Sequence, residues 1–116
     1  MNIYGNITEK EAKVLKVMGC PNSFKSFVGA EFKILGAVLD NETKTADDGS
    51  QYCTNYVKIE VETESAIEPI YCKFTQTVIA GQLEDLFDND LTEDFLFTLD
   101  YCESASGNRY LALSII

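Results

Sequence analysis

The chain of 116 residues contains neither histidine nor tryptophan, and only nine of its residues are lysine or arginine. Without histidine, Ser-His-Asp and Cys-His catalysis, histidine-assisted acid–base chemistry and mixed Cys/His metal sites are excluded. The chain also lacks the glycine-rich phosphate loops and the GxSxG nucleophile motif. We therefore expect a protein that is not an enzyme and that carries no cofactor.

Long apolar runs are missing as well. No stretch approaches the roughly 18 apolar residues that a membrane-spanning helix needs. The first six residues lack the charged start and the apolar block of a signal peptide. We expect a cytoplasmic protein with no membrane partner, folded as one domain that is long enough to bury a core without a metal or a disulfide.

Cysteine is present but never paired in sequence: the four cysteines are far apart, and no CxxC motif occurs. Structural zinc sites usually draw their ligands from close pairs. A free thiol inside a strand packs as a small hydrophobic group. We expect buried, reduced thiols, with a disulfide or a four-cysteine zinc site as the alternatives. The residues are Cys20, Cys53, Cys72 and Cys102.

Hydrophobic periodicity predicts five strands and one helix that follows the third strand. The order β-β-β-α-β-β predicts a mainly β fold, a five-stranded OB-like barrel with one helix between strands 3 and 4. The barrel would comprise residues 31–116, and residues 1–30 would be an N-terminal extension packed on it. The predicted strands are Glu31–Asp40, Tyr52–Glu64, Glu68–Thr77, Asp94–Glu103 and Arg109–Ile116, and the predicted helix is Ile79–Phe87.

Two segments outside these strands have local signals. Thr8 and Glu11 fit a capping box, which predicts a helix that ends near Gly19. The alternative is a strand, because Val14–Met18 also suits a β segment. The polar stretch Asn41–Ser50 predicts a linker with an Asp-Gly turn.

The second and third strands alternate cleanly, which predicts one buried face and one wet face. Tyr56 and Lys58 would share the wet face of one strand, and Tyr71 and Lys73 that of the next. Two rings and two ammonium groups on one hairpin suit single-stranded nucleic acid, because bases stack on the rings while lysine meets the phosphates. The alternative is an ordinary solvated sheet surface.

The order of runs, the Asp-Gly turn before Tyr52, the Tyr/Lys hairpin and the helix before the fourth strand resemble the small OB-fold single-stranded DNA-binding proteins, especially those of bacteriophages. The resemblance covers residues 31–116 as architecture. It implies sequence-independent binding of single-stranded DNA in phage replication or recombination. The contacts that it implies are Tyr56, Lys58, Tyr71 and Lys73, with Lys33, Lys44, Arg109 and Tyr110 as outer contacts.

Acidic charge opposes that function, since 19 acidic residues give a formal net charge of -10. Six of the acids lie close together after the start of the predicted helix, where a solvated helix face, a protein-binding surface and a metal site are the alternatives. The alternative function is an acidic inhibitor or adaptor that binds a basic DNA-handling protein by imitating nucleic acid. These acids are Glu84, Asp85, Asp88, Asp90, Glu93 and Asp94.

Self-association is a further expectation from the strand pattern. The mixed first strand and the apolar last strand offer edges through which a dimer or another homo-oligomer could form.

Overall fold

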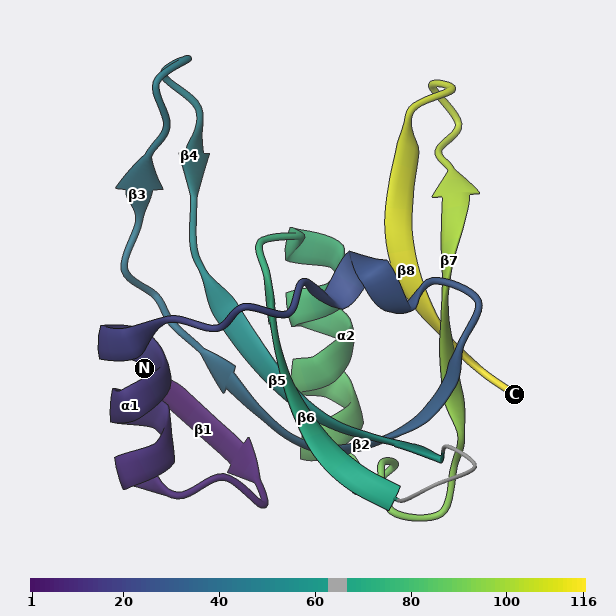
Figure 1. Ribbon diagram of the computed structural model, residues 1–116. Coiled ribbons are helices and arrows are strands. Elements are labelled where there is room, and N and C mark those ends of the chain that lie inside the picture. The colour runs from purple at the N-terminus through teal and green to yellow at the C-terminus, as the bar shows by residue number, and fades with distance from the viewer. Residues whose placement is uncertain (63–66) are drawn as a thin grey trace.

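The computed structural model describes residues 1–62 and 67–116 (Figure 1). The protein is mainly β, and its described residues form antiparallel strands, two α-helices and one short 3-10 helix. Neither helix in the described part is long and apolar enough to cross a membrane. The elements are β1 (Asn2–Gly5), α1 (Glu9–Met18), η1 (Phe24–Phe27), β2 (Glu31–Leu39), β3 (Lys44–Thr45), β4 (Gln51–Tyr52), β5 (Asn55–Glu62), β6 (Ile67–Phe74), α2 (Thr77–Asp88), β7 (Phe97–Glu103) and β8 (Arg109–Ile115).

The long strand β2 organises the sheet, whose strand order is β6-β5-β2-β7-β8. The start of β2 pairs with β7, through Glu31 and Phe32, and its second half pairs with β1 on the same side. β5 pairs along the other side of β2, with a shift of register between Ile34 and Gly36. A glycine inside a strand permits such an irregularity, and the bend lets β2 pair with different strands along its length.

The predicted barrel is not closed, because β6 and β8 are not paired among the described strands. The edge of β6 is covered instead by the segment before η1. There the Lys73 amide donates to the Asn22 carbonyl oxygen at 2.9 Å, and Ser23 forms a parallel bridge with Lys73. The sheet is therefore open between its two outer strands.

Several predicted boundaries need correction. The predicted linker Asn41–Ser50 contains β3 and leads into β4, and these two short strands form a separate hairpin. β7 begins at Phe97 rather than at Asp94, and α2 extends past both ends of the predicted helix Ile79–Phe87. The predicted end of the second strand at Glu64 and the link at Ser65-Ala66 lie outside the described residues.

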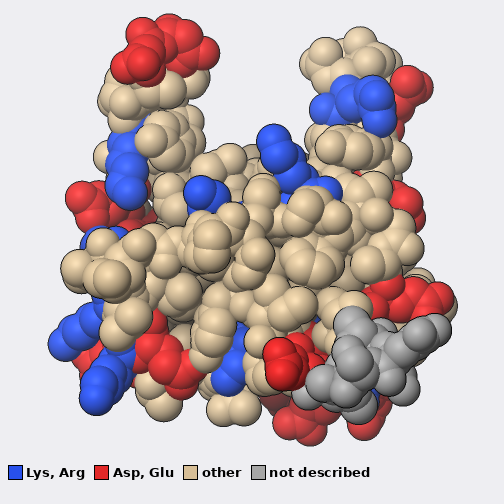
Figure 2. All heavy atoms as spheres, in the orientation of Figure 1, with Lys and Arg blue, Asp and Glu red and all other residues tan. Residues whose placement is uncertain are grey.

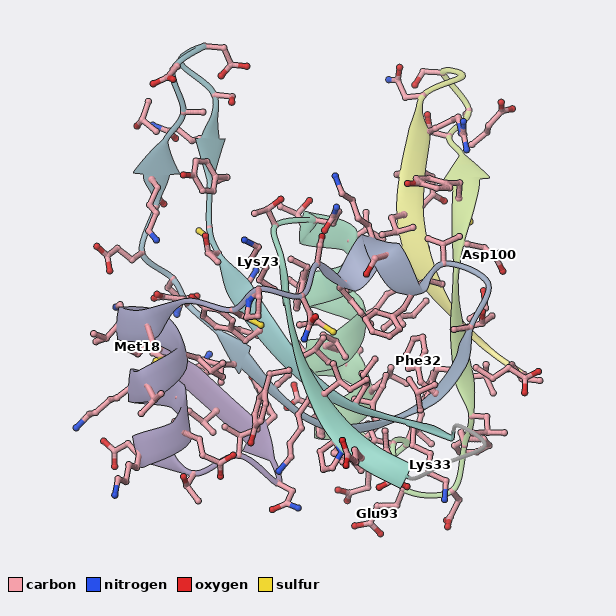
Figure 3. All side chains as sticks on the ribbon, viewed as in Figure 1. Met18, Phe32, Lys33, Lys73, Glu93 and Asp100 are labelled. Atoms are coloured by element: carbon pink, nitrogen blue, oxygen red, sulfur yellow. The ribbon has the colours of Figure 1, made fainter. Side chains whose placement is uncertain are left out.

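Two hydrophobic cores lie on opposite faces of the β2–β5–β6 layer. The larger core holds the inward side chains of the sheet under α2, and Phe32 lies in its interior (Figure 3). The smaller core lies under α1 and β1, where Ile7, Ala12 and Leu15 pack on Val38. The central strands are therefore covered on both faces.

The N-terminal helix is confirmed, including its capping box. The Glu11 amide donates to the Thr8 hydroxyl at 3.1 Å, and the Thr8 amide donates to the Glu11 carboxylate at 3.2 Å. The strand β1 before it was not anticipated, because four residues are too few to show a period. Residues 1–30 thus contribute both a strand of the sheet and a helix packed on its outer face.

Two glycines make a matched test of this packing. A Cβ on Gly36 would lie 2.9 Å from the Tyr4 carbonyl oxygen and 2.7 Å from Ile7 Cγ1, whereas a Cβ on Gly81 meets nothing within 4 Å. We expect Gly36→Ala to lower the free energy of unfolding by about 1–3 kcal/mol, because backbone on β1 must shift. Gly81→Ala, inside α2, should raise it by about 0.5–1 kcal/mol. Urea unfolding measures both, and equal effects would contradict the close approach of β1.

Candidate nucleic-acid interface

The hairpin β5–β6 has the register that the predicted Tyr/Lys patch requires. Tyr56 lies directly opposite Lys73, and Lys58 lies directly opposite Tyr71. The predicted wet face is nevertheless wrong. Tyr56 is only 5% exposed and Lys58 only 9% exposed, because α1 and β1 cover them, and Tyr71 is half-buried. Of the four side chains, only that of Lys73 is exposed.

The covered lysine has partners for its charge inside the protein. Lys58 Nζ donates to the Asn6 carbonyl oxygen at 3.0 Å and lies 3.8 Å from the Glu11 carboxylate. It also lies 5.4 Å from the centre of the Tyr71 ring. The Tyr71 hydroxyl donates to the same Glu11 carboxylate. A buried charge that is paired in this way stabilises the contact of α1 with the sheet and is not available to a phosphate.

The pKa values of Glu11, Tyr56 and Tyr71 are shifted because α1 and β1 pack over this part of the sheet. Burial, with the hydrogen bond to Glu11 next, raises the pKa of Tyr71 to about 12. Burial also raises the pKa of Tyr56. The hydrogen bond from Tyr71 holds the pKa of Glu11 below its ordinary value, helped by the Thr8 amide. The cluster therefore favours a carboxylate on Glu11 and neutral phenols around it.

The sequence did contain a signal for this cover. The N-terminal stretch has an apolar stripe of Ile7, Ala12 and Leu15, and a short amphipathic helix gains stability only by burying such a stripe. The stripe shows that α1 must pack on something, but its period does not show which face of the sheet it chooses.

Exposed cations gather elsewhere, between two projecting hairpins that we call the β3–β4 arm and the β7–β8 arm (Figure 1). Figure 2 shows a hollow between the arms, with Lys and Arg atoms on both arms and on the floor between them. Lys73 lies on that floor (Figure 3). We call this surface the arm face. Its cations are Lys25 of η1, Lys44 of β3, Lys73 of β6 and Arg109 of β8, and its aromatic residues are Tyr52 and Tyr101. Tyr110 lies on the opposite face of the β7–β8 arm, because it pairs with Cys102 whereas Tyr101 pairs with Leu111.

The β3–β4 arm carries one cation and one ring directly opposite each other, since Lys44 pairs with Tyr52. Its turn is held by Asp48, whose carboxylate accepts from the Ser50 hydroxyl at 2.6 Å and from the Ser50 amide at 2.9 Å. These bonds lower the pKa of Asp48. The tip of the arm is therefore acidic, as Figure 2 shows, while its base carries Lys44.

The β7–β8 arm carries the best-defined pair. The Arg109 guanidinium carbon lies 4.5 Å from the centre of the Tyr101 ring, and that tyrosine is 50% exposed. Both residues line a cavity of ≈ 320 Å³ with Tyr110 and the first residues of α2. The N-cap residue of α2, Gln76, makes no side-chain capping bond, and the first turn has no acid. The uncapped amides of this helix start favour an anion.

The predicted outer contacts lie at two ends of the molecule. Lys44, Arg109 and Tyr110 lie on the arms, whereas Lys33 lies at the opposite end, near Glu93 (Figure 3).

The six acids do not form one cluster. Glu84 lines a cavity at the base of the β3–β4 arm, Asp85 lines a groove beside β8, and Asp90 and Glu93 line a third cavity with Lys33; Asp88 and Asp94 are exposed.

The cysteines are all free thiols. Cys20 Sγ donates to the Tyr71 carbonyl oxygen at 2.9 Å, which places this thiol in the layer beneath α1. Burial raises the pKa of Cys72 to about 12, so this thiol stays protonated. Within the described ranges, no three His, Cys, Asp or Glu side chains are grouped so that they could hold a metal ion.

The Glu11 carboxylate makes the free energy of unfolding depend on pH. Its pKa in the folded protein lies below the ordinary value of 4.5, so its stabilising effect is present above about pH 5 and is lost as the pH falls through the lowered pKa. We expect Glu11→Gln to lower the free energy of unfolding at pH 7, and its difference from wild type to shrink toward pH 3. Glu9→Gln is the control, because Glu9 lies on the same helix turn but is exposed, and its ion pair with Lys13, at 3.9 Å, is also exposed to solvent. Urea unfolding at both pH values measures the effect, and a pH-independent Glu11→Gln difference would contradict it.

Among the described residues, cations and exposed rings therefore lie together on the arm face. A scan against protein-family models found no match, and searches of curated proteins and of solved structures found none either.

Proposed function

We propose that this protein binds single-stranded DNA without sequence preference, as a non-enzymatic protein of the phage replication or recombination type. The domain would be an OB-like barrel whose outer strands stay apart. The binding surface would be the arm face rather than the covered Tyr56/Lys58/Tyr71 layer. The observation that supports this most is the pair of Arg109 and Tyr101 on the β7–β8 arm, in which the guanidinium carbon lies 4.5 Å from the centre of a ring that is 50% exposed.

The chemistry of the arm face suits a single strand. Bases stack on exposed rings of any sequence, and each stacked base contributes about 1–3 kcal/mol. Arginine and lysine meet the phosphates, and the uncapped start of α2 adds amide donors between the arms. Strands of duplex DNA keep their bases inside, so they could not use these rings.

Negative net charge is compatible with this function when the two signs of charge lie at different ends. Glu93 lies at the end away from the arms (Figure 3). Three acids weaken the field on the arm face: Asp48 at the tip of one arm, Glu84 at the base of that arm, and Glu103, which lies directly opposite Arg109 on the other arm. We therefore expect modest affinity, with a log–log salt slope no steeper than about -3, because four cations are present.

The test is the fluorescence anisotropy of labelled oligo-dT at low and moderate salt. Tyr101→Ala should weaken binding by about 1–3 kcal/mol, because one stacking ring is lost. Arg109→Ala should weaken binding and make the salt slope shallower by about 0.7. Lys33→Ala is the matched control and should leave affinity unchanged, because Lys33 lies at the opposite end. Equal affinity in all three variants would contradict the placement on the arm face.

The competing function is the acidic adaptor that binds a basic DNA-handling protein. Absence of oligo-dT binding even at about 20 mM salt, where phosphate contacts are strongest, would favour it over DNA binding. In that case charge reversal at Asp88 and Asp90 should abolish capture of the basic partner.

A further inference from the structure

The last strand of the sheet, β8, has a free edge. In an antiparallel pair, residues alternate between those whose main-chain groups face the partner strand and those whose groups face away. The Ile116 amide donates to the Leu96 carbonyl oxygen of the segment before β7, at 3.0 Å. By alternation, the main-chain groups of Leu111, Leu113 and Ile115 face away from β7, toward the free edge.

A side chain of α2 occupies the middle of this edge. The Leu113 amide donates to Gln82 Oε1 at 2.8 Å, and Gln82 Nε2 donates to the Leu113 carbonyl oxygen at 3.1 Å. These are the two bonds that a residue of a neighbouring strand would make. In the described part of the chain, no hydrogen bond is assigned to the outward main-chain groups of Ile115. The edge is therefore satisfied at one position by a replaceable side chain and open beside it.

The open part of the edge borders a groove of ≈ 480 Å³. Its walls are largely apolar, with Leu86 of α2 on one side and Phe97 and Leu113 of the sheet on the other. Ile115, at its end, is 51% exposed. An extended chain that paired with β8 would place alternate side chains in this groove, since side chains alternate along a strand.

Charge distinguishes between the occupants of this edge. Among the described residues that line the groove, Asp85 is the one charged side chain. A second copy would bring another Asp85, and another net charge of -10, to this edge. Like charges brought together in this way disfavour self-pairing. A segment that carries lysine or arginine is favoured instead.

We propose that the free edge of β8 and the groove beside α2 bind an extended, basic and apolar segment of a partner protein, which pairs with Ile115 and displaces Gln82 from Leu113. This is strand addition to an exposed sheet edge. The site is independent of the arm face, because Arg109 lies at the other end of β8.

The experiment uses the full chain and a fluorescein-labelled heptapeptide in which valine alternates with lysine and threonine. The control peptide has the same sequence with N-methyl groups on the alternate residues that would face β8, so that its charge is unchanged but it cannot pair. Anisotropy should show binding of the first peptide and at least tenfold weaker binding of the second. Equal binding of both peptides, or of neither, would overturn the proposal.

Three variants locate the site. Ile115→Pro removes the edge amide and should weaken binding at least fivefold, whereas Ile115→Val keeps the amide and should bind like wild type. Gln82→Ala should bind more tightly, by several-fold, because no side chain has to be displaced. Unchanged affinity in both Ile115→Pro and Gln82→Ala would overturn the proposal.

Two further measurements separate this proposal from other outcomes. Oligo-dT affinity should be the same in wild type and Ile115→Pro, which also reports that the variant is folded. If the wild-type protein does not bind oligo-dT, that result would contradict the DNA-binding function proposed for the arm face and would leave the strand-addition proposal unaffected. Sedimentation that shows a wild-type dimer, converted to monomer by Ile115→Pro, would make a second copy the occupant and overturn the basic segment.

Discussion

Burial of β5 on both faces is the constraint on which the rest of the structure depends. Val57 and Ile59 face the larger core under α2, while Tyr56 and Lys58 face the smaller core under α1. Placing Lys58 in that layer would be costly without a partner, because a buried charge loses its hydration. The Asn6 carbonyl oxygen and the Glu11 carboxylate supply that partner. The position of the N-terminal segment is therefore tied to the sheet by both apolar contact and charge.

This cover decides where recognition can occur. With the hairpin face enclosed, exposed cations and exposed rings lie together on the two arms and on the floor between them, while the other exposed lysines lie on α1 and at Lys33 (Figure 2). The arms leave the body of the domain as hairpins (Figure 1), so in the proposed function their side chains would contact the DNA from two sides. At the other end of β8, Asp85 of α2 borders an open sheet edge. The proposed surfaces thus differ in charge as well as in place, which keeps a nucleic acid and a basic segment from competing.

Much of the architecture could be predicted from local pattern. The succession of strands along the chain, the hairpin that carries Tyr56 and Tyr71, the capping box at Thr8 and the helix before β7 all depend on patterns between residues close in sequence. The pattern could not reveal β1, which is too short to show a period. Nor could it reveal that the polar stretch Asn41–Ser50 belongs to an arm, because turn residues look alike in a linker and in a hairpin.

The sequence by itself determined the fold class and the absence of histidine chemistry, because composition and period are properties of the chain alone. It also determined that the Tyr/Lys residues would meet on one hairpin. Only the tertiary structure decided that Tyr56 and Lys58 of this hairpin are buried between the sheet and the N-terminal segment. The reason is that an alternating strand specifies two faces but not what covers each one, and α1, which covers Tyr56, lies more than thirty residues away in the chain. The exposed site therefore lies where two distant hairpins face each other.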